Sequence, residues 1–544
     1  MAENYSRIEL ESRLCFYEKQ NQYLASENAR VNEANKRLVE QNREYQVELD
    51  RVNELLKLAR EALYGRKSEK NLLPNGQIGM FEETEEFAAA EIPKKKVKEH
   101  TRAPKRKMEE IYGNLPTEEP EIHYLTDEEK TCKRCGGHMC VIGFDTHTEI
   151  KHIPAVYKVR EIRLEKCVCK CCEGKMDEDG EEHPVFAVAE GPRALIRGSM
   201  ISPSLAAHEI NAKLNLRLPL YCLGQEYARN GLCRSRQTMS NNMLALGGML
   251  EPLYERMKKE LVRMEIIHAD ETPWQVNHGN GKEGPVRGYF WVYTSGKYEP
   301  KQIVLYDYEN GRGAEYPKKF LRGFSGYGHC DGLGQYSAVR GFTRVGCFAH
   351  LRRYFLNAVK VQSDRNDYTT AAGVGLLMID EIFKAERKDP EKPREASPLS
   401  LEEIGEIRKT ATKALLEKFF GWCAEKEREN LPSAKTREAI QYALNQKEAL
   451  SRILEDPRLE LTNNAAEHAV RPVAVGRKNW LFSDRERGAR ALSVLFSIVE
   501  TAKANALKPY EYLKHIFETM RGGKNIEWPE LLPWSGKIPE SVRI

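Results

Sequence analysis

The sequence lacks a long apolar run, an apolar leader and a nucleotide-binding loop, and each absence excludes a class of protein. No stretch of 18 or more apolar residues occurs in the 544 residues, which excludes a protein that spans a membrane by helices. The first residues, MAENYSRIELESRL, are charged from the third onward, so we expect no secretory signal and a cytoplasmic protein. No G-x-x-x-x-G-K-[ST] motif occurs, which argues against phosphate-loop nucleotide hydrolysis.

The chain also has little net charge, because 85 Lys and Arg residues are balanced by 81 Asp and Glu residues to give a formal +4. A charged partner therefore has to be inferred from local clusters of charge and not from the total. A chain of 544 residues is too long for a single hydrophobic core, so we expect several domains.

Residues 1–62 carry a heptad pattern with a strict four-three spacing, and four successive heptads place Asn at one core position. The period of 3.5 residues predicts a coiled coil, in which each buried amide can pair with its symmetry mate in a homodimer. The alternative is one amphipathic helix lying on its own globule. The seam consists of Leu10, Leu14, Tyr17, Asn21, Leu24, Asn28, Val31, Asn35, Leu38, Asn42, Tyr45, Leu49, Val52 and Leu56.

Residues 63–125 have the composition of a linker, with acidic residues first and a proline-broken basic run after them. An extended basic segment can follow DNA phosphates by releasing counterions, although a solvated linker without a partner has the same composition. The run contains Lys94, Lys95, Lys96, Lys98, Arg102, Lys105, Arg106 and Lys107.

Seven of the 13 cysteines lie between Cys132 and Cys172. Two Cys-x-x-Cys pairs within residues 126–180 predict a zinc-binding domain, because four thiolates suit a tetrahedral structural zinc ion. The alternative is a reduced cluster without metal. The predicted zinc ligands are Cys132, Cys135, Cys169 and Cys172, and the spare thiols are Cys140, Cys167 and Cys171, of which Cys167 or Cys171 could replace a ligand.

Residues 181–260 have a helical pattern with one break. Pro219 is expected to open a helix that Gly231 closes, and Ser235 is expected to cap a second helix. Two helices joined by a Gly-containing turn resemble a helix-turn-helix, which would place Arg236 at the start of a recognition helix. Any helical hairpin produces the same pattern, so DNA contact here is one of two interpretations.

From residue 261 the pattern changes to strands that alternate with turns, followed by a basic helix, which predicts an α/β sheet. Asp270 and Asp331 each end an apolar strand, and two aspartates on adjacent strands can hold a pair of magnesium ions. Glu467 is the candidate third acid, on one helical face with Asn464 and Arg471. Alternatively the aspartates are turn formers, and Asn464 with Glu467 forms a capping box.

Basic residues follow the second and third acids, and we expect them to position DNA phosphates, with solubility as the alternative role. Trp274 and Trp480 lie beside the acids and could stack on an unpaired base, or pack in the core. The expected phosphate contacts are His350, Arg352, Arg353, Arg471, Arg477 and Lys478.

Several blocks of the sequence resemble the signature blocks of the insertion-sequence-66 family of bacterial transposases. They are HADETPWQV, GHCDGLGQYSAV followed by CFAHLRRYF, TNNAAEHAVRPVAVGRKNWLF, the N-terminal YGRKSEK, the double Cys-x-x-Cys segment and the closing LLPW. The blocks occur in the family's order and span nearly the whole chain. One departure is Cys167, which stands where the family often has an aromatic residue before the second Cys-x-x-Cys pair.

The resemblance implies a DDE transposase of the bacterial cytoplasm with a ribonuclease-H-like catalytic core in residues 261–500 and a C-terminal tail in residues 501–544. Asp270, Asp331 and Glu467 map to the three acids, and a helical insertion at about 356–455 separates the second from the third. The implied reaction is cleavage and strand transfer of double-stranded DNA with two magnesium ions, at transposon ends and target. Helper proteins encoded by the same element are also implied.

Two other functions are compatible with these features. One is a zinc-containing, coiled-coil DNA-binding regulator derived from a transposase. The other is a metal-dependent DNA nuclease. The complete set of three acids counts against the regulator, and the dimerising seam with the basic N-terminal half counts against a simple nuclease.

Overall fold

The computed structural model describes residues 7–64, 156–163, 165–168, 186–188, 191–192, 194–279, 284–332, 334–362, 364–387, 399–429, 431, 433–522 and 526–544. The chain divides into two compact units, residues 1–77 with 159–544 and residues 78–158. The basic linker and the predicted zinc ligands Cys132, Cys135, Cys169 and Cys172 lie outside the described residues. Within the described ranges, no helix is long and apolar enough to cross a membrane.

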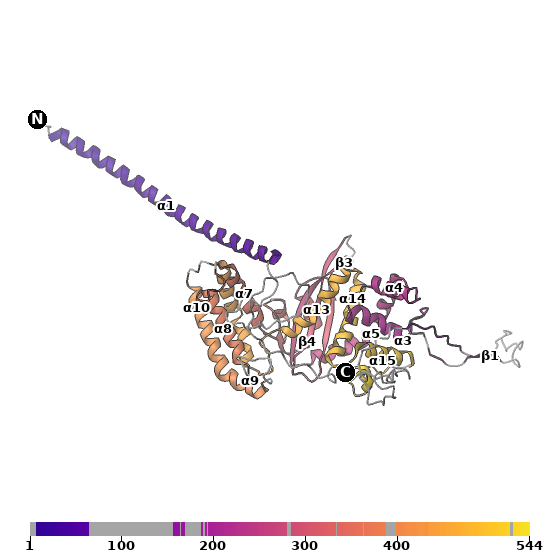
Figure 1. Cartoon of the computed structure of the whole chain (residues 1–544). Helices are drawn as coiled ribbons and strands as arrows, with labels where there is room; N and C mark the ends of the chain where they lie inside the picture. Colours follow the sequence, from indigo (N-terminus) through magenta and orange to yellow (C-terminus); the bar gives the residue numbers. More distant parts are fainter. Residues whose placement is uncertain are drawn as a thin grey trace, which may run out of the picture. The chain divides into compact units, whose positions relative to one another are not determined.

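The heptad segment forms a single helix, α1 (Arg7–Tyr64), of 58 residues (Figure 1). Its seam residues remain open to solvent: Val31, Leu38, Leu49 and Leu56 expose between 51% and 56% of their surface. The helix therefore does not bury this part of its seam against the described residues of its own chain.

The helical region before the sheet contains α3 (Pro203–Ile210), the π-helix η2 (Asn211–Asn215), α4 (Leu220–Arg229) and α5 (Arg236–Val262). The predicted break is confirmed: Pro219 precedes α4, Gly231 has a φ of +81°, and the hydroxyl of Ser235 accepts the amide of Thr238 at 3.0 Å. The short strands β1 (Lys166–Val168) and β2 (Phe186–Val188) form an antiparallel pair ahead of these helices.

The central sheet is mixed, with the order β5-β4-β3-β6-β7 and β8 paired to β3. Neighbours pair antiparallel from β5 to β3 and parallel from β3 to β7, and β8 runs parallel to β3. The strands are β3 (Ile266–His278), β4 (Val286–Ser295), β5 (Val304–Glu309), β6 (Gly326–His329), β7 (Phe342–Val345) and β8 (Phe482–Arg485).

One prediction about this sheet is wrong in detail, because Asp270 does not end its strand. β3 continues to His278 because β4 pairs with it across Asp270, where Val292 lies opposite, and β8 extends the pairing further. The parallel pairing of β3 with β6 stops at His268 and His329, two residues before Asp270 and Asp331. Asp270 therefore lies where the neighbouring strand ends and not where its own strand ends.

Helices cover one face of this sheet tightly. The C-terminal helices are α13 (Asn464–Trp480), α14 (Glu486–Ala504) and α15 (Pro509–Gly522), and Figure 1 shows α13 and α14 beside β3 and β4. The Tyr306 hydroxyl donates to the Ala469 carbonyl of α13 at 2.7 Å, and the Ser497 hydroxyl of α14 accepts the Tyr306 amide at 2.8 Å. A Cβ added to Gly247 of α5 would lie 2.8 Å from the Cβ of Ala491 of α14. The glycine therefore lets the backbones of α5 and α14 approach closely.

The other face of the sheet is covered by α6 (Glu315–Phe320) and the 3-10 helix η3 (Gly334–Ala338). Tyr293 stacks on Phe320 with ring centres 4.0 Å apart, and Trp291 meets Tyr336 edge to face. The last residues of the chain form η6 (Trp528–Leu531) and η7 (Glu540–Val542), and Leu531 and Val542 belong to the hydrophobic core around the sheet. The Tyr512 hydroxyl of α15 donates to the Leu531 carbonyl at 2.6 Å.

A second hydrophobic core lies between Asp331 and Glu467 in the sequence and includes Phe355, Leu376 and Phe419. The segment after Phe355 is helical, as its pattern predicts. Its helices are α7 (Phe348–Val361), α8 (Ala371–Ala385), α9 (Leu401–Ile407), η4 (Arg408–Thr412), α10 (Lys413–Glu427), α11 (Ala434–Asn445), α12 (Lys447–Ser451) and η5 (Arg452–Leu454).

One buried arginine ties the helices of this second core together. The Arg408 side chain is 4% exposed and pairs with Glu386 at 2.7 Å. It also donates to three backbone carbonyls, those of Ile453, Asp456 and Leu459. Because every partner is buried or half-buried, removing the guanidinium leaves several polar groups without water or protein to bond them.

We predict that Arg408→Met destabilises the folded protein by about 3–5 kcal/mol, because it leaves the Glu386 carboxylate buried and unpaired. The measurement is urea denaturation followed by the helical circular dichroism signal. The matched control is Arg428→Met at the exposed end of α10, which should change stability by less than about 0.5 kcal/mol. Equal denaturation midpoints for the two variants would show that the contacts of Arg408 do not stabilise this core.

Candidate active site

Three carboxylates from separate elements converge where the parallel pairing of β3 with β6 ends. Asp270 lies on β3, and Asp331 follows β6 at the level where the parallel pairing of the two strands has just ended. Glu467 lies in the first turn of α13. His350 lies 3.7 Å from Glu467 and lines a cavity together with Asp331, so the second and third acids face the same region. The charges of Asp331 and Glu467 both raise the pKa of Asp270.

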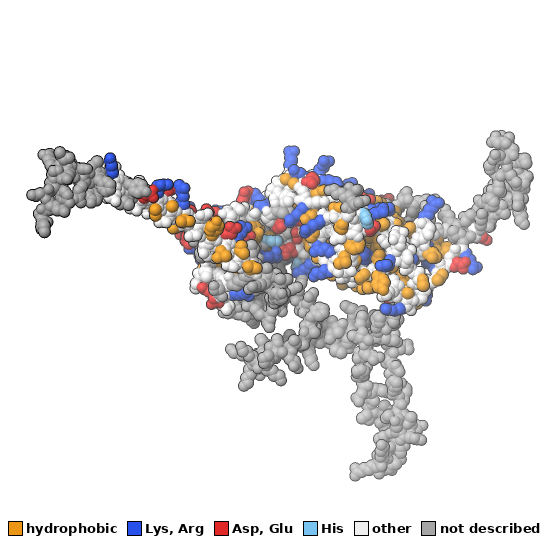
Figure 2. All heavy atoms as spheres, turned by 90° about the horizontal axis from the view of Figure 1, so that it is seen from above, with side chains coloured by type: hydrophobic (Ala, Val, Ile, Leu, Met, Phe, Trp, Pro, Cys, Tyr) orange, Lys and Arg blue, Asp and Glu red, His pale blue; other side chains and the backbone are white. Residues whose placement is uncertain are grey.

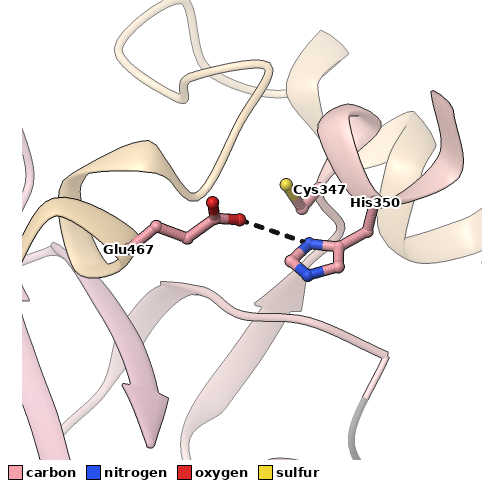
Figure 3. A group of neighbouring side chains, drawn as sticks. All are labelled: Cys347, His350 and Glu467. Atoms are coloured by element: carbon pink, nitrogen blue, oxygen red, sulfur yellow. Dashed lines mark ion pairs between the residues drawn. The ribbon is translucent and has the colours of Figure 1, made fainter. Parts of the chain in front are cut away.

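Glu467 is not a helix-capping residue. The residue that precedes α13 is Asn463, and no side-chain cap bond is made there, so the capping-box interpretation of Asn464 and Glu467 is wrong. The Glu467 carboxylate instead points towards α7, with Oε1 3.7 Å from His350 Nδ1 (Figure 3). Its Oε2 lies 3.8 Å from the Arg353 guanidinium. Oε1 is buried and accepts no hydrogen bond from the described residues.

Asn463 fixes the start of α13 on the strand that carries Asp270. This side chain is 1% exposed; its Nδ2 donates to the Ala269 carbonyl at 2.9 Å and its Oδ1 lies 3.0 Å from His268 Nδ1. Its backbone amide donates to Cys347 Sγ at 3.2 Å, and its carbonyl accepts the Glu467 amide at 3.2 Å. Asn463 therefore connects β3, the residue before α7, and the first turn of α13. Asn463 was not among the residues predicted from the sequence, although the pair Asn463-Asn464 stands directly before the third acid.

Two buried histidines lie beneath the acids, each two residues before an aspartate. The His268 and His329 rings stack with centres 4.5 Å apart. His329 Nε2 accepts the Glu460 amide at 3.2 Å, and the Glu460 carboxylate lies 3.1 Å from His268 Nε2. Burial holds the pKa of His329 well below its ordinary value, so this ring is neutral at pH 7.

The surroundings of Asp270 disfavour its charged form. Burial is the main cause that raises the pKa of Asp270 to about 7, and the charges of Glu271, Asp331 and Glu467 add to it. Glu271 is paired with Arg312 and accepts the Tyr336 hydroxyl at 3.2 Å, which assigns it a structural role. A site of crowded carboxylate oxygens, with one buried oxygen lacking a donor, fits a hard divalent cation such as magnesium.

A softer set of donor atoms shares Glu467. Cys347 Sγ, a His350 ring nitrogen and a Glu467 oxygen all lie within 4.8 Å of one another (Figure 3). Burial raises the pKa of the Cys347 thiol to about 11, so at pH 7 it is a thiol that accepts the Asn463 amide. In this state Cys347 supports the backbone, because metal ions are bound by the thiolate and not by the thiol.

A cavity of about 410 Å³ opens beside the acids. Asp331, which follows β6, and His350 of α7 line it, together with Tyr442, Asn445 and Gln446 at the end of α11. The helices between the second and third acids therefore form a wall of the candidate site.

The predicted phosphate contacts fall into two groups. Arg352 pairs with Asp380 at 2.7 Å, and Arg477 donates to the Pro273 carbonyl, so both bind within the protein. The other group is exposed or lines the site. His350 and the half-exposed Arg353 lie beside Glu467. Arg471 and Lys478 are exposed on α13. Arg236 is exposed at the start of α5, with its guanidinium 5.7 Å from the centre of the Tyr221 ring.

The two tryptophans beside the acids take part in packing. Trp274 is fully buried and its indole nitrogen donates to the Ser483 hydroxyl at 3.0 Å, which excludes stacking on a base. Trp480 is partly buried, with the Lys213 ammonium 4.0 Å from its ring centre.

Four family models match successive segments of the chain. The model described as Transposase IS66 family matches residues 198–491, and the IS66 C-terminal element matches residues 497–534. The zinc-finger binding domain of transposase IS66 matches residues 129–173, and Transposase C of IS166 homeodomain matches residues 51–119.

Similar proteins occur in Sinorhizobium fredii (strain NBRC 101917 / NGR234), where each carries the name of an uncharacterized protein. The protein y4qI is 27% identical over 90% of this chain and 89% of its own length. The protein y4hP is 26% identical over 76% of this chain and 75% of its own. Because the first family model alone spans more than half of the sequence, and the other three flank it in order, the chain belongs to the IS66 transposase family.

Proposed function

We propose that this protein is a transposase that cleaves DNA at the ends of a bacterial insertion sequence and transfers the strands, with Asp270, Asp331 and Glu467 as magnesium ligands. The observation that carries the proposal is the convergence of these three acids: Asp270 and Asp331 lie two residues beyond the end of the β3–β6 pairing, and His350 both contacts Glu467 and lines the cavity beside Asp331. Family membership supports DNA as the substrate, and a set of carboxylate donors is suited to magnesium.

The topology supports a ribonuclease-H-like core for this reaction. Three antiparallel strands, β5, β4 and β3, are followed across the sheet by the parallel strands β6 and β7. The first acid is on the central strand, the second follows its parallel neighbour, and the third is on a helix packed against β3 and β4. We infer that the helices between Asp331 and Glu467 are an insertion into this core.

The side chains around the acids have distinct tasks in this proposal. Asp270, Asp331 and Glu467 would hold magnesium, which when bound would supply activation of water or a 3′-hydroxyl and stabilisation of the leaving oxygen. His350 and the half-exposed Arg353, both beside Glu467, hold the scissile phosphate in place. Asn463 keeps Glu467 in register with Asp270, so that the carboxylates need no rearrangement when DNA arrives.

DNA is held by several basic parts of the chain. Figure 2 shows Lys and Arg side chains more often than Asp and Glu over the part that contains the sheet. Arg236 at the start of α5, and Arg471 and Lys478 on α13, are exposed, whereas Arg352 is held in an ion pair with Asp380. A zinc ion bound by Cys132, Cys135, Cys169 and Cys172 would stabilise the domain that the zinc-finger model matches.

We also infer that α1 forms a parallel coiled coil between two copies of this chain. The seam residues are exposed, and the buried asparagines of a heptad seam pair best with their own symmetry mates. A dimer places two active sites in one particle, one for each end of the element.

The cleavage prediction concerns each acid separately. Asp270→Asn, Asp331→Asn and Glu467→Gln should each lower the rate of magnesium-dependent cleavage of element-end DNA by at least about 100-fold, while DNA affinity is retained. The control is Glu425→Gln, an exposed acid on α10, which should cleave at the normal rate. Normal cleavage by any of the three variants would remove that acid from the site.

The metal prediction uses stability in place of activity. Without magnesium, Asp270→Asn should raise the thermal midpoint by roughly 2–4 °C, because it removes a buried charge from a group of acids. Magnesium should stabilise the wild type but not this variant. The control is Asp307→Asn, because burial also raises the pKa of Asp307 to about 6, and this variant should keep the magnesium effect. An equal magnesium shift in wild type and Asp270→Asn would refute the assignment.

The dimer prediction compares two adjacent residues of α1. Leu38→Glu lies on the seam and should convert the full-length dimer into a monomer in light scattering, because a charge replaces a core contact. Val39→Glu, at a position that is 68% exposed and off the seam, should leave the mass unchanged. Two variants of equal mass would eliminate the coiled-coil dimer.

A further inference from the structure

A second cavity, of about 540 Å³, lies where the last turns of α5 meet the end of α6 and the loop that leads into β6. It adjoins the start of β6, whereas Asp331 follows the end of that strand, so it is separate from the acidic site. Five basic residues and one acid line it: Lys258, Lys259, Arg263, Lys319, Arg322 and Glu255.

The positive charge of this cavity is only partly neutralised. Lys319 pairs with Glu309 at 3.0 Å, and Arg263 lies 3.4 Å from the Glu260 carboxylate. Among the described residues, Lys258, Lys259 and Arg322 make no ion pair within 4.0 Å. A concave surface with this excess of charge attracts and concentrates an anionic ligand.

The chemistry of the cavity favours phosphate oxygens. The Lys258 ammonium is held over the Phe320 ring, 4.3 Å from its centre, which orders a side chain that would otherwise be mobile. Gly323 has a φ of +91°, and this turn sets Arg322 and Ser325 at the cavity. Lysine, arginine and hydroxyl donors are the groups that contact the DNA backbone without reading its sequence.

The position of the cavity along α5 favours duplex DNA over a small anion. Arg236 begins α5 and Lys258 follows it by 22 residues, which corresponds to about 33 Å along a helix. The helical repeat of B-DNA is about 34 Å. The two ends of α5 can therefore meet phosphates of one duplex a single turn apart.

We propose that this cavity binds the sugar-phosphate backbone of double-stranded DNA, one turn away from the contact made by the start of α5. The choice of DNA as the polyanion rests on the proposed function, but the cavity takes no part in the chemistry at the acids. It anchors the duplex independently of the sequence and of the metal.

The test measures DNA affinity of the full-length protein in EDTA, so that catalysis does not enter. Fluorescence anisotropy with a 50-base-pair duplex at several salt concentrations gives the affinity and its salt dependence. Lys259→Gln with Arg322→Gln changes two exposed side chains and should preserve folding. The double variant should weaken binding about 10-fold and reduce the slope of log affinity against log salt by about 2, because two counterion-releasing contacts are lost.

Adding Lys258→Gln should reduce the slope by about one more. The control is Lys413→Gln with Lys418→Gln, two exposed lysines of α10, which should leave the slope unchanged. An unchanged slope in the cavity variants would overturn the proposal. It would also be overturned if inorganic pyrophosphate raised the thermal midpoint of wild type but not of the variants while DNA binding stayed equal, since the ligand would then be a small anion.

Failure of this proposal and failure of the proposed function give different results. If the acids are not catalytic but the cavity binds DNA, cleavage is absent and the slope still falls in the cavity variants. If the acids are catalytic and the cavity does not bind DNA, Asp270→Asn abolishes cleavage and the cavity variants keep the wild-type slope.

Discussion

The hydrogen bonds of Asn463 hold together the elements that carry the acids. Its side chain is bonded to the residue before Asp270, and its backbone carbonyl accepts the amide of Glu467. Because Asn463 is buried, these bonds compete with little water and fix α13 on β3 at one position. The buried pair His268 and His329 supports the same place from beneath, so both aspartates extend from packed strands and not from free loops.

The long stretch of sequence between Asp331 and Glu467 folds into helices of its own. The helices between Asp331 and Glu467 build their own hydrophobic core, which Arg408 ties together through buried polar contacts. The end of α11 lines the cavity beside Asp331, so these helices shape the candidate site as well as lengthening the chain. A loop of equal length without a core would leave the site open to water and Glu467 less firmly placed.

The sequence predicted the elements whose causes are local. Alternating apolar residues indicated the strands, and Ser235 was correctly expected to cap α5, because a cap depends on a few neighbouring residues. Features set by distant contacts were missed: Asp270 lies within a strand because β4 and β8 extend β3, and Trp274 is buried because it packs in the core against Phe290. Likewise, the sequence could not show that Arg352 is bound to Asp380, 28 residues away.

The central claim is that carboxylates from β3, from the end of β6 and from α13 form one divalent-metal site. Anomalous diffraction from a crystal of the protein grown with manganese tests it most directly, since manganese takes the oxygen ligands that magnesium takes. The account predicts anomalous density between the carboxylates of Asp270, Asp331 and Glu467 in the wild type, and its loss in Asp270→Asn. Density only elsewhere in the molecule, with these three carboxylates free of metal, would contradict it.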